Sequence, residues 1–162
     1  MRLPEKFTVD QINAIIDTRE QTPFDLSPMQ CERGTLQVGD YSIRGLETVV
    51  AIERKSLPDF VACCGTERDR FQRELNSLRG WQVSAVIIEA AWNELNLAQW
   101  RSRLTAKQVK ASALSWISQG HNLVFAGGHE QAAEVCKGIL FYTARNRYRE
   151  ARQLAEFAVV AK

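Results

Sequence analysis

The sequence is poor in histidine and cysteine and has no long apolar run. It contains two His and four Cys, which form neither a CxxC pair nor the Cys/His spacing of a zinc site. No apolar segment approaches the roughly 20 residues that span a membrane, and the N-terminus lacks the apolar core of a signal peptide. We therefore exclude a zinc domain, expect no membrane partner, and expect an intracellular, cytoplasmic protein whose cysteines are small buried residues.

Length and charge are those of one globular domain with an uneven charge distribution. The chain has 162 residues, of which 45% are hydrophobic, and its net charge is +2. Residues 1–53 carry nine acidic and five basic side chains, whereas residues 99–120 carry four basic side chains and no acid. This distribution suits a cation site beside a polyanion. From charge alone, however, a solvated helix face is the simpler explanation of the basic segment.

Hydrophobic periodicity predicts one α/β domain over residues 1–162. Strands are expected over residues 12–17, 35–38, 41–44, 46–53, 83–88 and 122–126. Helices are expected over residues 57–63, 67–79 and 105–119 and from about residue 129 onward, with Ser56 and Thr66 as N-caps of the first two. Residues 21–33 have the composition of a loop, and residues 89–104 fit no single element.

The feature that carries chemistry is Gly39-Asp40-Tyr41 followed by Ile52-Glu53-Arg54-Lys55. Phosphodiester hydrolysis needs a nucleophilic water and neutralised phosphate charge, and a hard divalent cation supplies both. Mg²⁺ prefers carboxylates and water, so Asp40 and Glu53 on neighbouring strands are candidate ligands. Residues i and i+2 of a strand point to the same face, so Lys55 would join Glu53 while Arg54 points away. An orientable ammonium there can hold a water or offset phosphate charge.

The spacing alone leaves a second interpretation open. An Asp followed by Glu-x-Lys occurs by chance, and Glu53 and Lys55 could form a surface ion pair of little energetic value. The apolar run of residues 49–52 argues against an exposed strand, and Asp17 adds a carboxylate at the end of another apolar strand. Several carboxylates at the ends of buried strands are unfavourable without a cation. On spacing, a nuclease site and a structural ion pair are about equally well supported.

Three segments together resemble the XPF/Hef family of structure-specific nucleases. The segments are residues 15–20 (IIDTRE), 38–41 (VGDY) and 52–60 (IERKSLPDF). The family signature is GD…ERKxxxD, and this sequence matches every fixed position. Arg68 and Gln72 also stand where the family has an R-x-x-x-Q pair on the next helix. The resemblance extends over about residues 10–145 and implies a restriction-endonuclease-like, or PD-(D/E)XK, α/β fold: a central mixed β-sheet flanked by helices.

The resemblance also implies roles for the matching residues, position by position. Asp40 and Glu53 would bind Mg²⁺, for which Mn²⁺ would substitute, and the backbone carbonyl of Arg54 would face the metal. Lys55 would be the catalytic base or would position the attacking water. Asp17 would belong to the catalytic set with Asp40, Glu53 and Lys55, and Asp17 and Glu20 would line the site and assist a cation. Arg19 and Asp59 would support the site, and Arg68 and Gln72 would approach DNA or the site. For Arg19, Asp59 and Arg68, structural ion pairing is an equally good explanation.

The implied activity is Mg²⁺-dependent endonucleolytic cleavage of DNA, with branched, flap or fork structures as substrates in repair or recombination. One alternative is a non-catalytic DNA-binding or scaffolding subunit, because the family pairs active with degenerate domains. Another is a PD-(D/E)XK enzyme with a different role on DNA. The sequence contains neither the helix-hairpin-helix module that usually follows in the family nor a helicase motor. A single nuclease domain is therefore expected over residues 1–162.

A homodimer through the C-terminal helices is also expected. The resemblance implies it, because nuclease domains of the family pair through their late helices. Apolar residues continue beyond the needs of one small core at Leu154, Ala155, Phe157 and Ala158. The arginines of this segment would either follow DNA phosphates or form the solvated side of the pairing helix: Arg145, Arg147, Arg149 and Arg152.

Overall fold

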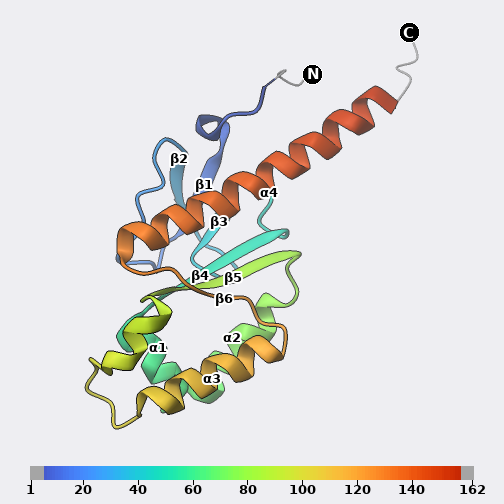
Figure 1. Ribbon diagram of the computed structural model, residues 1–162. Helices are drawn as coiled ribbons and strands as arrows, with labels where there is room; N and C mark the ends of the chain where they lie inside the picture. Colours follow the sequence, from blue (N-terminus) through green and yellow to red (C-terminus); the bar gives the residue numbers. More distant parts are fainter. Residues whose placement is uncertain (1–5, 158–162) are drawn as a thin grey trace.

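A mixed six-stranded sheet forms the centre of the protein (Figure 1). The computed structural model describes residues 6–157. The strands are β1 (Asn13–Asp17), β2 (Gln30–Gly34), β3 (Tyr41–Ile43), β4 (Val50–Ser56), β5 (Val83–Glu89) and β6 (Leu123–Phe125), in the order β2-β1-β3-β4-β5-β6. Strand β3 is antiparallel to β1 and β4, whereas the pairs β1–β2, β4–β5 and β5–β6 are parallel.

Helices cover both faces of the sheet, which confirms the expected fold class. Helix α4 (His129–Phe157) crosses one face, and α1 (Leu57–Cys64), α2 (Arg68–Leu78) and α3 (Ala106–Ser118) lie on the other (Figure 1). Two short 3₁₀ helices span Val9–Gln11 and Trp92–Leu97. Each face has its own buried core, one built around α4 and one around α1, α2 and α3.

Strand β4 contributes to both cores through its alternating side chains. Ile52 belongs to the core under α4, whereas Ala51 belongs to the core under α1, α2 and α3. Successive side chains of a strand point to opposite faces. Arg54 therefore continues the face of α4, and Glu53 and Lys55 continue the face of α2. The register of β4 thus decides which charged side chain enters which layer.

Two sequence predictions are wrong around the second strand. Residues 30–33, expected in a loop, belong to β2, and residues 35–38, expected as a strand, form a loop. Strand β2 lies at the edge of the sheet and has no fully buried side chain, so it lacks the apolar alternation of a half-buried strand. The strand expected over residues 46–53 spans Val50–Ser56 instead. It starts later than expected because the amide of Val49 closes a turn onto the carbonyl of Leu46 at 2.9 Å.

The helices follow the sequence predictions closely, except at one cap. Ser56 caps α1, since its Oγ accepts from the amide of Asp59 at 3.3 Å. Thr66 does not cap α2, whose N-cap is Glu67 without a side-chain hydrogen bond. Three of the free cysteines are buried as expected, but Cys31 on β2 is exposed. Within residues 6–157, no helix has both the length and the apolar character needed to cross a bilayer.

Gly39 lets the chain approach β4 closely enough to place the residue that follows it. Its φ of +80° is one that side chains disfavour. A Cβ at this position would lie 2.9 Å from the carbonyl oxygen of Ile52, and the amide of Asp40 donates to that same oxygen at 2.7 Å. Both the conformation and the available space therefore require glycine.

We predict that Gly39→Ala lowers the free energy of unfolding by roughly 2–4 kcal/mol, because alanine meets both backbone strain and the backbone of β4. Gly45→Ala is the matched control, since Gly45 has a φ of +85° but nothing within 4 Å of an added Cβ. Urea denaturation of the two variants measures the difference. Equal losses in both variants would contradict the close approach at Gly39.

Candidate active site

Asp40 is fixed between neighbouring strands by its own main chain and by that of Arg54. Its carbonyl accepts from the amide of Asp17 at 2.8 Å, and its amide donates to Ile52 at 2.7 Å. The amide of Arg54 donates to Oδ2 of the Asp40 carboxylate at 2.8 Å. Because the N–H and C=O of one strand residue lie on the same edge, the carbonyl of Arg54 also lies on the edge of β4 that faces Asp40.

Glu53 and Lys55 both project from the face of β4 that packs against α2, as their spacing predicts. Lys55 Nζ donates to Glu53 Oε1 at 2.7 Å, and the two side chains are only 10% and 16% exposed. A second carboxylate, Oε2 of Glu74 on α2, lies 3.1 Å from the same Nζ. The ammonium also lies 5.5 Å from the centre of the Phe71 ring. The pair is therefore buried, and the interpretation as a solvated surface ion pair does not describe it.

The electrostatics of the site are those of acidic groups crowded at the edge of an apolar core. Burial, and next the charge of Glu53, raise the pKa of Asp40 from 3.8 to about 7 against the opposing hydrogen bond from Arg54. Burial also raises the pKa of Glu53 above its usual value, although Lys55 opposes the change. For Lys55 burial acts in the opposite direction, but Glu53 and Glu74 overcome it and raise the pKa of the ammonium.

Asp40 and Glu53 line one pocket of about 330 Å³, together with Arg19, Gly39 and Glu74. Among residues 6–157, no three His, Cys, Asp or Glu side chains are grouped as a ready metal site. Mg²⁺ keeps several waters, however, and is commonly held by one or two carboxylates. The donor set of Asp40 and Glu53 therefore fits Mg²⁺ or Mn²⁺, whereas a pocket without Cys or His does not fit zinc.

The side chain of Arg54 lies on the opposite face of β4 and joins a buried ion-pair network. It donates to both carboxylate oxygens of Glu89 at 2.6 and 3.0 Å, and its other Nη lies 3.3 Å from Glu20 Oε1. Nδ1 of His129, at the start of α4, lies 2.6 Å from the same Glu89. Arg54 thus ties β4 to β5 and α4, and the prediction that Arg54 and Lys55 point in opposite directions is confirmed.

Asp17 is fully buried at the end of β1, and protein donors occupy both of its carboxylate oxygens. Arg19 donates to the two oxygens at 2.7 and 3.1 Å, and the amide of Leu36 donates at 2.8 Å. Burial opposes the charge of Asp17, but these hydrogen bonds outweigh it and lower the pKa of Asp17 to about 2. Arg19 lines the pocket, so Asp17 affects the site indirectly, by fixing the position of the Arg19 guanidinium.

Glu20 and Asp59 have local structural partners. Glu20 Oε1 accepts from the amide of Thr22 at 2.8 Å and faces Arg54, so this carboxylate belongs to the network on the α4 side. Asp59 is exposed, and its carboxylate accepts from Ser56 Oγ at 2.7 Å at the start of α1. Among the described residues, neither side chain lines the pocket of Asp40 and Glu53.

The R-x-x-x-Q pair on α2 contacts α3. Arg68 donates to Ser112 Oγ at 2.8 Å, and its guanidinium carbon lies 4.8 Å from the centre of the Trp116 ring. Gln72 Oε1 accepts from Trp116 Nε1 at 2.9 Å. Trp116 is fully buried, so Gln72 satisfies the indole N–H of a core residue while Arg68 lies over its ring, and both contacts join α2 to α3.

Glu74 is the site residue that the sequence analysis did not identify. It lies three residues after Phe71 and four before Leu78, both of which are buried in the core. Residues three and four apart share a helix face, so Glu74 stands on the face of α2 that packs against the sheet. The sequence contained one signal for this position, because Glu74 is a carboxylate on an otherwise apolar helix face. The family signature does not include it.

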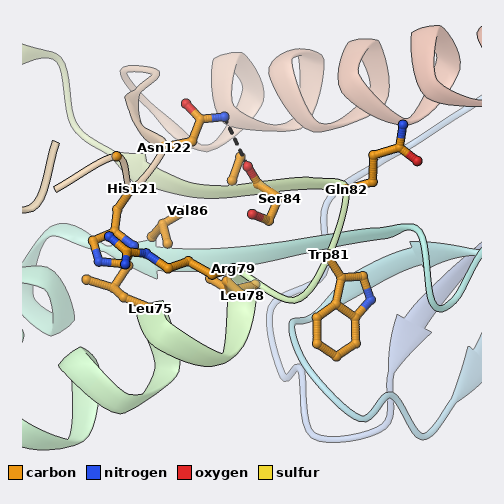
Figure 2. A pocket seen from close by; sticks show the side chains of 11 residues that line it. Leu75, Leu78, Arg79, Trp81, Gln82, Ser84, Val86, His121 and Asn122 are labelled. Carbon is orange, nitrogen blue, oxygen red and sulfur yellow. Dashed lines mark hydrogen bonds between the residues drawn. The ribbon is translucent and has the colours of Figure 1, made fainter.

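A second cavity, of about 290 Å³, lies beside the end of α2 and the starts of β5 and β6 (Figure 2). Its lining includes Arg79, His121 and Asn122, and none of its lining residues within 6–157 is a carboxylate. The described lining therefore does not offer the carboxylate ligands that a hard cation prefers. Burial lowers the pKa of His121, and the charge of Arg79 adds to the effect. The metal-compatible chemistry therefore belongs to the pocket of Asp40 and Glu53.

Comparison with known proteins identifies the family and relatives of similar fold. The family profile described as "ERCC4 domain" matches residues 16–139. The solved structure "XPF from Aeropyrum pernix" has a TM-score of 0.63 and 19% identity, over 88% of this chain and 69% of that chain. The structure "XPF from Aeropyrum pernix, complex with DNA" has a TM-score of 0.64 and 18% identity, over 84% of this chain and 66% of that chain. A comparison with curated proteins gave no match.

The two kinds of comparison carry different conclusions. At 18–19% identity the solved structures establish the fold, and this chain spans about two thirds of their length. The profile match covers most of the sequence and contains Asp17, Asp40, Glu53 and Lys55. The chain belongs to the ERCC4 domain family.

Proposed function

We propose that this protein is a metal-dependent endonuclease that hydrolyses phosphodiester bonds in DNA. The observation that carries the proposal is the placement of Asp40 and Glu53 in one pocket, with the ammonium of Lys55 held 2.7 Å from Glu53. Membership of the ERCC4 domain family supports a nuclease. DNA as the substrate is supported by the similar fold of the Aeropyrum pernix XPF whose structure is described as a complex with DNA.

Asp40, Glu53 and the main-chain carbonyl of Arg54 are the groups that we propose hold Mg²⁺, with Mn²⁺ as a substitute. When bound, such a cation lowers the pKa of a water and neutralises charge on the phosphate. The two carboxylates gain from this arrangement, because burial and mutual repulsion disfavour their charged forms. Asp17 and Glu20 support the site indirectly, by fixing Arg19 and Arg54.

Lys55 contributes a positive charge and a directed hydrogen-bond donor. Two carboxylates contact its ammonium, at 2.7 and 3.1 Å, so the side chain is charged and held in place. A charged lysine orients the attacking water and stabilises the negative charge that develops on the phosphate. Of the two roles expected from the sequence, positioning of the water is therefore favoured over action as the base. Arg19, 70% exposed at the pocket, adds a second cation toward the phosphate.

We further propose that the substrate is a branched, flap or fork DNA and that the role lies in repair or recombination, as the XPF/Hef signature implies. The competing function is a non-catalytic DNA-binding or scaffolding subunit. The intact set of Asp40, Glu53 and Lys55 and its burial count against that alternative, because degenerate nuclease domains have no need to keep acidic groups together at an energetic cost.

A homodimer through α4 is part of the same proposal. The C-terminal part of α4 extends beyond the sheet (Figure 1). Leu154 and Phe157 are 68% and 87% exposed there. Leu154 comes eleven residues, about three turns, after the buried Thr143, so it continues the buried face of the helix beyond the core. A second copy of the chain would cover this face; Ala158, also expected in the interface, lies outside the described residues.

The proposed activity predicts cleavage that depends on both metal and structure. Labelled flap, fork, four-way junction and plain duplex DNA are incubated with the protein in Mg²⁺, Mn²⁺ or excess EDTA. We expect cleavage of the branched substrates with either metal, none in EDTA, and loss of activity in Asp40→Asn, which keeps shape but removes a ligand charge. Undiminished cleavage in EDTA would contradict the metal mechanism, and failure of the wild-type protein to cut any substrate would favour the non-catalytic alternative.

The dimer proposal predicts a concentration-dependent assembly. Sedimentation velocity at micromolar concentrations is expected to show a dimer for the wild-type chain and a larger monomer fraction for the double substitution Leu154→Glu, Phe157→Glu. The control is Leu114→Glu, because Leu114 on α3 is similarly exposed, at 54%, but lies on the other side of the sheet. A wild-type protein that sediments only as a monomer would refute the proposal.

A further inference from the structure

Lys55 has a second carboxylate partner that the sequence signature does not include. Its Nζ lies 2.7 Å from Glu53 Oε1 and 3.1 Å from Glu74 Oε2. Glu53 belongs to β4, only two residues away, whereas Glu74 comes from α2 and also lines the pocket of Asp40 and Glu53. The lysine side chain is 10% exposed, so these two anions are its immediate electrostatic environment.

Glu53 cannot bind a cation and Lys55 equally strongly. In the proposed function it is a ligand of a divalent cation, which attracts a carboxylate more strongly than a single ammonium does. The same cation repels Lys55, because both are positive and close together in a partly buried pocket. With Glu53 as its sole anion, Lys55 would then lose most of its anchoring at the moment when its position matters.

Glu74 is well placed to keep Lys55 in position. Its other oxygen, Oε1, accepts from Arg70 at 3.0 Å, and Arg70 is also held by Glu67 at 2.6 Å. The backbone of α2 around Glu74 is anchored by the buried side chains of Phe71 and Leu75. A carboxylate supported on a helix by its own ion pair is preorganised, which is what a precise catalytic geometry requires.

We propose that Glu74 is a positioning residue of the active site, which keeps the Lys55 ammonium beside the reacting phosphate while Glu53 serves the cation. This inference rests on the proposed nuclease function. It assigns Glu74 an effect that is exerted through Lys55 and not through the cation, so the rate of the chemical step depends on Glu74 whereas the affinity of the protein for metal does not.

The experiment is a double-mutant cycle on Lys55→Ala and Glu74→Gln, measured as single-turnover cleavage of a branched DNA with saturating enzyme and Mg²⁺. The glutamine keeps the shape of Glu74 and removes its charge. The matched control is Asp69→Asn, which removes one exposed negative charge from the same helix, α2. Mn²⁺ affinity without DNA, followed by electron paramagnetic resonance, and thermal melting are recorded for every variant.

We expect Glu74→Gln to slow cleavage by about 10–100-fold, the range found when a group that orients a functional residue is removed. Asp69→Asn is expected to cleave like wild type, and Glu74→Asp, with a shorter reach, to lie between wild type and Glu74→Gln. In the Lys55→Ala background, Glu74→Gln should have no further effect, because the group through which it acts is gone. Mn²⁺ affinity should stay within about twofold of the wild-type value in both Glu74 variants.

Three results would overturn the inference. Wild-type cleavage rates in folded Glu74→Gln would show that Lys55 does not need Glu74. A full additional loss in the Lys55→Ala background would show that Glu74 acts independently of Lys55. A fall in Mn²⁺ affinity that matches the fall in rate would make Glu74 a metal ligand. If the wild-type protein itself does not cleave, the proposed function fails first, and this inference with it.

Discussion

The carboxylates of Asp40 and Glu53 lie close together at the edge of a largely apolar sheet, and the arrangement of the site depends on this proximity. Gly39 brings Asp40 against β4, where the amides of Asp40 and Arg54 fix its position. Glu53 stands beside it, and burial raises the pKa of both acids. This repulsion lowers the stability of the folded protein when both carboxylates are charged. We propose that this unfavourable charge prepares the pocket for a cation.

Strand β4 separates this chemistry from the scaffold through its side-chain alternation. Glu53 and Lys55 face α2, whereas Arg54 faces α4 and holds Glu89 at 2.6 and 3.0 Å. The two adjacent cations thus make different contacts. Lys55 lies next to the pocket, whereas Arg54 connects β4 to β5 and α4. In the proposed nuclease this separation is useful, because a catalytic group must be held closely by neighbours that do not themselves react.

The sequence predicted most of the strands, the helices that flank the sheet, and the opposite orientations of Arg54 and Lys55, because apolar periodicity and strand alternation are local properties. It did not predict β2, whose exposed edge position leaves no apolar pattern, or the part played by Glu74, which a helix from elsewhere in the chain brings to Lys55. The contacts of Arg68 and Gln72 with Trp116 were also missed. Those contacts depend on how α2 and α3 pack, and sequence spacing does not determine that packing.

The most direct test of the carboxylate pair is the free energy of unfolding of wild type and Asp40→Asn between pH 4 and pH 8 in metal-free buffer. Because the folded-state pKa of Asp40 is about 7 and its usual value is 3.8, ionisation destabilises the wild type as pH rises through this interval and then levels off. We expect the two proteins to be similar near pH 4, with Asp40→Asn more stable by up to about 4 kcal/mol at pH 8. Mg²⁺ is expected to stabilise only the wild type. Parallel stability curves, with no effect of Mg²⁺ on either protein, would contradict the account.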